Sequence, residues 1–166
     1  GQILSEDGRQ VAVLSRNKGG PEAFARKVAE LSLAYNRARM LTEWNPQGGG
    51  NIVIAHLASE GVPLWYAPPP PGQKPSIEPK HWVTGHGNKE AAFSHCRQVV
   101  NADLLTLNDL PTVQEMAHIR EIDGVIAGRD GFKDDHVMAL VLAEWNRRTL
   151  PSTPRDDQGW RRNPKA

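Results

Sequence analysis

The chain has 166 residues, of which 39% are apolar and 23% are charged, and its formal net charge is +1. This length fits one globular domain with a sizeable core, and the charge balance does not mark a strongly basic protein. No apolar run approaches the about 18 residues of a membrane-spanning helix, so we expect no membrane partner. The one cysteine, Cys96, excludes an internal disulfide, and we expect a buried, reduced thiol in a cytoplasmic protein.

The first 36 residues predict a β-hairpin followed by a helix. Apolar residues on both sides of a polar turn at 6–9 predict the hairpin over 2–15. Pro21 suits the first turn of a helix, and apolar residues recur at helical spacing over 21–36.

A strand–helix–strand unit is predicted next. Short apolar runs at 38–43 and 62–66 flank a predicted helix at 50–59. This order implies a parallel pair of strands with a crossover helix. The proline-rich segment 67–80 is predicted to be an extended surface loop, although a ligand of SH3-type domains has a similar composition.

The C-terminal half predicts three helices joined by short extended pieces. The predicted helices cover 88–101, 112–120 and 134–148, and the extended pieces cover 104–107 and 122–127. The residues Thr112 to Glu115 fit a capping box that would start the second of these helices. We therefore expect one α/β domain over 1–150 and a flexible basic tail over 151–166.

Three acidic residues stand out as candidate metal ligands. Glu43 ends a predicted buried strand, which is where α/β sheets place their ligands, although a strand-end glutamate often only faces solvent. Asp134 and Asp135 begin a predicted helix, where one acid would serve as a cap. Two adjacent acids exceed the needs of a cap, so one could cap while the other binds a metal. His136 is either a ligand or proton shuttle, or a residue that contacts only solvent or backbone.

Other motifs carry less information. The turn Gly48-Gly49-Gly50 before a helix is a weak signal for phosphate binding, and the chain has no P-loop. His81, His86 and His95 do not have the spacing of a zinc site. Basic residues that could contact DNA phosphates are Lys89, Arg147 and Arg148, and a solvated surface is the equal alternative.

These segments together resemble the C-terminal nuclease domain of the large terminase subunit of tailed phages and prophages. The resemblance rests on "TEWNPQGGG" at 42–50, "HWVTGHGNKEAAF" at 81–93 and "GFKDDHVMALVLAEW" at 131–145, and it covers nearly the whole chain. The last segment is the most specific, because it is close to the family's Gly-x-x-Asp-Asp-hydrophobic-x-x-Ala signature.

The resemblance implies an RNase H-like mixed sheet flanked by helices and a metal-dependent endonuclease that cuts concatemeric viral DNA. The family's acids fall on Glu43 and on Asp134 or Asp135, which would hold two Mg²⁺ or Mn²⁺ ions. The implied partners are double-stranded DNA, the portal protein, the small terminase subunit and an ATPase motor domain.

One departure from the family pattern concerns its first carboxylate, which sits on a central strand just before the hairpin. The chain starts at Gly1, inside what resembles the second strand, and Asp7 in the hairpin turn is a poor substitute. We therefore expect an N-terminal truncation without the first strand and one metal ligand. Two rival hypotheses follow: a catalytically impaired module that docks on DNA or on the portal, and a resolvase-like nuclease for branched DNA.

Overall fold

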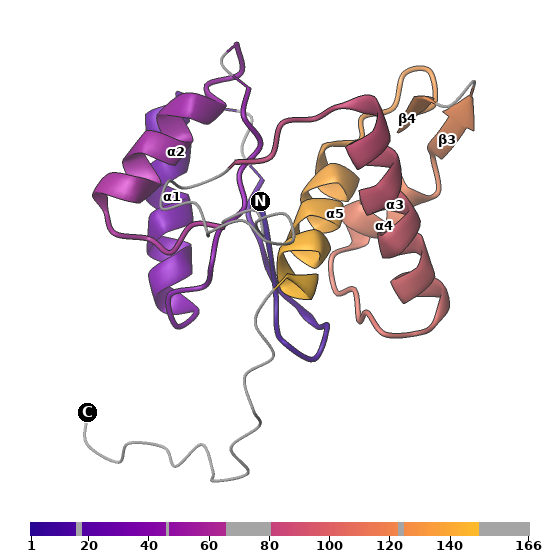
Figure 1. The fold of residues 1–166 in the computed structure, drawn as a ribbon, viewed down its shortest axis with the longest axis horizontal. Coiled ribbons are helices and arrows are strands. Elements are labelled where there is room, and N and C mark those ends of the chain that lie inside the picture. Colours follow the sequence, from indigo (N-terminus) through magenta and orange to yellow (C-terminus); the bar gives the residue numbers. More distant parts are fainter. Residues whose placement is uncertain (16–17, 46, 66–80, 123–124, 150–166) are drawn as a thin grey trace, which may run out of the picture.

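A computed structural model describes residues 1–15, 18–45, 47–65, 81–122 and 125–149. The described chain is a mixed α/β fold in which helices lie on two sides of the N-terminal hairpin (Figure 1). This confirms the predicted α/β class. The predicted loop at 67–80 and the predicted tail at 151–166 lie outside the described residues. The helices are α1 (Pro21–Ala34), α2 (Gly50–Ser59), α3 (His86–Asn101), α4 (Leu110–Met116) and α5 (Asp135–Arg148).

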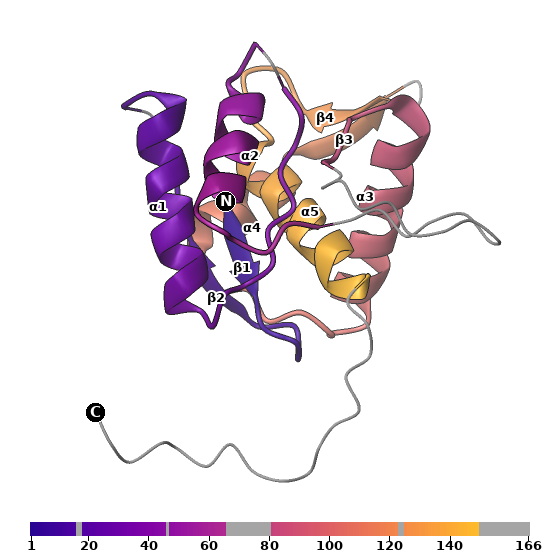
Figure 2. The ribbon, with the colours of Figure 1, turned by 60° about the vertical axis from the view of Figure 1, so that its left-hand side comes forward.

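The predicted N-terminal hairpin is confirmed. β1 (Gln2–Leu4) pairs antiparallel with β2 (Gln10–Val13). Gly8 has φ +85° in the turn, and a Cβ atom there would lie 2.2 Å from the carbonyl oxygen of Leu104. This close approach lets Arg9 form a parallel bridge with Thr106, so the predicted extended piece at 104–107 continues the hairpin sheet. Figure 2 shows the hairpin between α1 and α5.

α1 and α2 form the first core. Helix α1 ends two residues before the predicted limit, because Asn36 and Arg37 adopt positive φ angles of 54° and 57°. The two helices pack against each other and against the chain that follows α2. The buried residues of this core are Ala25, Val28, Ala29, Val53, Leu57, Val62 and Leu64.

The predicted parallel pairing of 38–43 with 62–66 is present, but each segment is shorter than a regular strand. Met40 and Leu64 form an isolated parallel bridge. The Met40 N–H donates to the carbonyl of Pro63 at 2.8 Å, and the Trp65 N–H donates to the carbonyl of Met40 at 2.8 Å. The crossover helix between them is α2, as predicted.

The chain between α3 and α5 differs most from the prediction. The Asp109 carboxylate accepts the N–H of Thr112 at 2.9 Å and caps α4, so the capping box predicted for Thr112 and Glu115 is wrong. The predicted helix over 112–120 therefore starts at Leu110 and ends at Met116. Its predicted last residues belong to β3 (Ile119–Ile122), which pairs antiparallel with β4 (Val125–Gly128).

The second core lies between α3 and α5. Both helices lie within two residues of their predicted limits. The buried thiol predicted for Cys96 is confirmed. The buried residues of this core are Trp82, Ala92, Cys96, Val137, Leu140, Val141 and Leu142. Within the described ranges, no helix is both long and apolar enough to cross a membrane.

Candidate functional site

Glu43 lies at the end of the extended segment 38–43, where this segment pairs with the chain around Trp82. It forms a parallel bridge with Trp82. The Trp82 N–H donates to the carbonyl of Thr42 at 3.0 Å, and the Trp44 N–H donates to the carbonyl of Trp82 at 2.6 Å. Beyond the bridge, the hydroxyl of Thr84 donates to the Glu43 carboxylate. Main-chain pairing therefore fixes the position of this acid, and a neighbouring hydroxyl orients it.

The glycine-rich turn after Glu43 is needed for close packing. A Cβ atom on Gly50 would lie 2.4 Å from the Glu43 carbonyl oxygen, and Gly49 has φ +78°. Asn45 accepts the N–H of Gly50 on its carbonyl at 2.7 Å and the N–H of Gly48 on its side chain at 2.9 Å. Because Asn45 already binds two of these N–H groups, the turn holds α2 against Glu43 rather than offering an open phosphate cradle.

The two aspartates at the start of α5 are both released from capping. The side chain of Glu115 accepts the main-chain N–H groups of His136 and Val137, at 2.7 and 2.9 Å. Asp134 occupies the N-cap position but makes no capping hydrogen bond with its side chain to the described residues. An acid from α4 therefore caps α5, and Asp134 and Asp135 are left for other contacts.

The basic residues proposed to contact DNA differ in how they are engaged. Lys89 lies 3.4 Å from the carboxylate of Asp134. Arg147 binds the buried carboxylate of Glu144 through two hydrogen bonds of 2.6 and 2.9 Å. Arg148 is exposed, with its guanidinium 4.9 Å from the ring of Trp145. Of these three residues, Arg148 is the most open to a phosphate.

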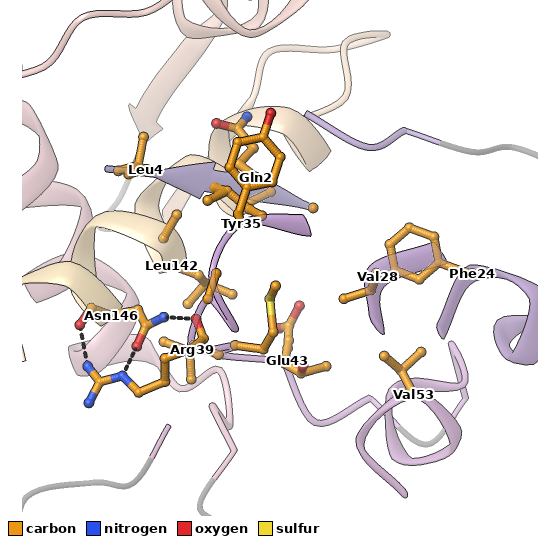
Figure 3. A pocket seen from close by; sticks show the side chains of 18 of the residues that line it. Gln2, Leu4, Phe24, Val28, Tyr35, Arg39, Glu43, Val53, Leu142 and Asn146 are labelled. Carbon is orange, nitrogen blue, oxygen red and sulfur yellow. Dashed lines mark hydrogen bonds between the residues drawn. The ribbon is translucent and has the colours of Figure 1, made fainter. Parts of the chain in front are cut away.

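A cavity of about 1520 Å³ lies between the hairpin, α1, the segment 38–43 and α5. Figure 3 shows it from close by, with Gln2 and Leu4 across from Arg39 and Glu43. Its lining includes Glu43 and Asp135 but not Asp134. The fold therefore brings one of the two helix-start aspartates to the same cavity as the strand-end glutamate.

The N-terminal amino group lies at the same cavity. It donates to the carbonyl of Leu14 at 2.8 Å. Burial lowers the pKa of this amino group, and the negative charge of Asp135 partly offsets that effect. Gly1 and Asp135 both line this cavity.

Two of the predicted metal ligands, Glu43 and Asp135, line this cavity with carboxylates, which are the ligands that hard cations prefer. Mg²⁺ is commonly held by one or two carboxylates together with water and substrate phosphates, and Glu43 and Asp135 could supply these. Within the described ranges, no group of three or more His, Cys, Asp or Glu side chains could hold a metal ion. Asp7 does not extend the pair, because it binds Ser5 and lies 3.0 Å from Arg9 in its own turn.

Two further features lie near the acids. The role of His136 was left undecided by the sequence, and the stacking beside Glu43 was not predicted. The ring of His136 lies 3.4 Å from Asp109, so its contact is with that carboxylate. Beside Glu43, Trp44 stacks on His81 with ring centroids 4.4 Å apart. The stacking of Trp44 on His81 and the hydrogen bond from Thr84 to Glu43 both depend on the bridge between Glu43 and Trp82. No spacing of residues in the sequence predicts that bridge.

Comparisons with known proteins do not assign this chain to a family. No family model matches the chain, and the curated proteins contain no significant match to it.

Proposed function

We propose that this chain is an RNase H-like, metal-dependent DNA endonuclease domain from the large subunit of a viral DNA-packaging terminase. The observation that supports the proposal most is the cavity shared by Glu43 and Asp135, which lie 92 residues apart in the sequence. The motifs that resemble the terminase nuclease contain both residues. Because carboxylates are the preferred protein ligands of Mg²⁺ and Mn²⁺, this pair suits the proposed cofactor.

In this proposal Glu43 and Asp135 hold the cation, and Thr84 orients the carboxylate of Glu43. When bound, such ions activate water and stabilise the leaving oxygen of a phosphodiester. Lys89 neutralises Asp134 at the start of α5, which lowers the electrostatic cost of bringing a DNA phosphate there.

The proposed substrate is double-stranded DNA held mainly through its phosphates, with little reading of base sequence. Of the three basic residues proposed to contact DNA, Arg148 is the exposed one, so it is the proposed phosphate contact. The proposed partners are the portal protein, the small terminase subunit and an ATPase motor domain, and the proposed location is the cytoplasm of the host cell.

A second candidate function is a catalytically impaired module that docks on DNA or on the portal. One observation favours it: the described residues contain no group of three or more potential ligands around the shared cavity. A pair of carboxylates without a third acid would bind one ion weakly and would not support two.

Calorimetric titration with Mn²⁺, followed by plasmid cleavage in the same buffer, separates the two functions. The nuclease hypothesis predicts Mn²⁺ binding that Glu43→Gln and Asp135→Asn each abolish and that Asp134→Asn retains. Thr84→Val should weaken binding by roughly 10–100-fold, as expected when the partner of a metal ligand is lost. Cleavage should follow the same order.

The outcomes are distinct. An absence of Mn²⁺ binding together with retained DNA binding would support the docking module. An equal loss of Mn²⁺ binding in Asp134→Asn and Asp135→Asn would contradict the assignment of Asp135, rather than Asp134, as the metal ligand. Cleavage that survives Glu43→Gln would remove Glu43 from the site and with it the proposed nuclease.

A further inference from the structure

Two stacked rings lie at the surface directly after Glu43. The ring centroids of Trp44 and His81 are 4.4 Å apart, and the two ring planes differ by 25°. Trp44 is nevertheless 39% exposed. Within the described part of the chain, His81 is the only ring or cation that stacks on it. The indole of Trp44 therefore keeps ring surface that a ligand could cover.

The alternation of extended chain separates these rings from the candidate metal ligand. The hydroxyl of Thr84 donates to the carboxylate of Glu43, so these two side chains share one face of the paired segments. Neighbouring residues in extended chain point to the opposite face, which is where Trp44, His81 and Val83 lie. The cavity lining includes Glu43 and, among the described residues, none of these three. We call Trp44, His81 and Val83 the ring platform.

Hydrogen bonds fix the backbone beneath the ring platform. The Trp44 N–H donates to the carbonyl of Trp82 at 2.6 Å, which ties the two segments together. The side chain of Asn88 donates to the carbonyl of Val83 at 2.7 Å and accepts the N–H of Gly85 at 2.8 Å. Because these bonds already order the chain, a ligand on the platform would not have to order it, and a preorganised site binds more tightly.

A second ring stack in the same chain shows what a fully engaged ring looks like. Phe132 stacks on His118 with ring centroids 3.8 Å apart, and the guanidinium of Arg129 lies 4.6 Å from the same ring. Phe132 thus has two partners, whereas Trp44 has one within the described ranges. The ring platform is also widened by Val83, which is 56% exposed.

The chemistry of the ring platform suits an unpaired nucleobase. Aromatic side chains bind single-stranded nucleic acid by stacking, and they tolerate any sequence because every base has a π face. Inside a duplex the neighbouring bases cover both faces of a base, so a base must leave the stack or belong to a single-stranded end. Trp44 directly follows Glu43, so a strand with a base on Trp44 passes close to the candidate metal ligand.

We propose that the ring platform binds an unpaired nucleobase of single-stranded DNA beside the candidate metal site. The class of ligand rests on the proposed function, because DNA is the proposed substrate. The proposal adds a preference among DNA substrates: DNA with unpaired nucleotides binds more tightly than DNA without them.

The test compares two fluorescent oligonucleotides by anisotropy in a buffer that contains EDTA. One has about eight thymidines, and the other has the same number of phosphates at abasic sites. The unchanged chain should bind the thymidine oligonucleotide about 5–100-fold more tightly, the range expected for stacking of one base. Trp44→Leu should remove this preference, and Trp44→Phe should retain most of it because a ring remains. A duplex with a thymidine overhang should likewise bind more tightly than the same duplex with blunt ends.

The matched control is Phe132→Leu, which removes an exposed ring stacked on another histidine and should keep the full preference. Equal binding of the thymidine and abasic oligonucleotides by the unchanged chain would overturn the proposal. So would a Trp44→Leu chain that keeps the preference, or a Phe132→Leu chain that loses it. The assay needs no metal, so a missing base preference would leave the Mn²⁺ result unaffected, and absent Mn²⁺ binding would leave the base preference intact.

Discussion

Glu115 of α4 accepts the main-chain N–H of His136 at 2.7 Å, and through this bond it closes the N-terminus of α5. The same oxygen also accepts the N–H of Val137, at 2.9 Å. A carboxylate at this position satisfies two N–H groups that have no partner inside the helix, and it interacts favourably with the helix dipole. The cap comes from another helix, so the aspartates of α5 remain available.

We predict that Glu115→Ala lowers the free energy of unfolding by about 1–2 kcal/mol, the cost of losing a helix cap. Urea denaturation would measure the change. Glu121→Ala, at an exposed position of β3, is the control and should change stability by less than about 0.5 kcal/mol. If Asp134→Ala costs more than Glu115→Ala, then Glu115 is not the main cap.

A second prediction concerns the buried carboxylate of Glu144, which is only 1% exposed. Arg147 binds it at 2.6 and 2.9 Å, and His95 lies 3.1 Å from it. Arg147→Met would leave this charge without its main partner, so we expect a loss of about 3–5 kcal/mol in the free energy of unfolding. Urea denaturation would measure the loss.

The control for this pair is Arg148→Met, because Arg148 is exposed on the same helical turn. We expect it to change stability by about 0.5 kcal/mol or less. The double variant Arg147→Met/Glu144→Leu should regain part of the loss, since it removes the buried charge as well as its partner. Similar effects of the two arginine substitutions would contradict the assigned role of Arg147.

A third prediction concerns the pH dependence of stability. The hydroxyl of Thr112 lowers the pKa of Asp109, burial opposes this, and the Thr112 N–H and the His136 ring lower it further. The pKa in the folded protein thus lies below the value of about 3.9 expected in the unfolded chain. The stabilisation is therefore present above about pH 4 and is lost as the pH falls through the pKa of the folded state.

We expect Asp109→Asn to be less stable than the unchanged chain at neutral pH, and the difference should shrink as the pH falls below about 4. Denaturation curves collected across the acid range would show this. Asp103→Asn, at an exposed position, is the control for the removal of one carboxylate. A gap between Asp109→Asn and the unchanged chain that widens in acid would contradict the predicted sign.

A fourth prediction concerns the thiol of Cys96. Burial raises the pKa of this thiol to about 12, and the charge of Glu144 adds to the effect. Since the thiolate is the reactive form, the native protein should react with Ellman's reagent about 1000-fold more slowly than the chain unfolded in guanidinium at the same pH. Native and unfolded rates within about tenfold of each other would mean that the thiol is accessible.

The sequence determined the elements that depend on local pattern. The spacing of apolar residues predicts α1, α3 and α5 to within two residues, because one helical face must be buried whatever lies opposite it. The hairpin of β1 and β2 follows from its turn residues. The pairing of 38–43 with 62–66 follows from chain order, although the hydrogen bonds are too few to make regular strands.

The tertiary structure decided which side chains meet. Asp109, rather than Thr112, caps α4, and Glu115 caps a helix 21 residues further along the chain. The sequence supplied Asp134 and Asp135 as equal candidates, and packing brought only Asp135 to the cavity that Glu43 lines. Hydrogen bonds and ion pairs between distant residues depend on how helices and segments dock. A local pattern fixes which face an element buries but not which polar partners the neighbouring element presents there.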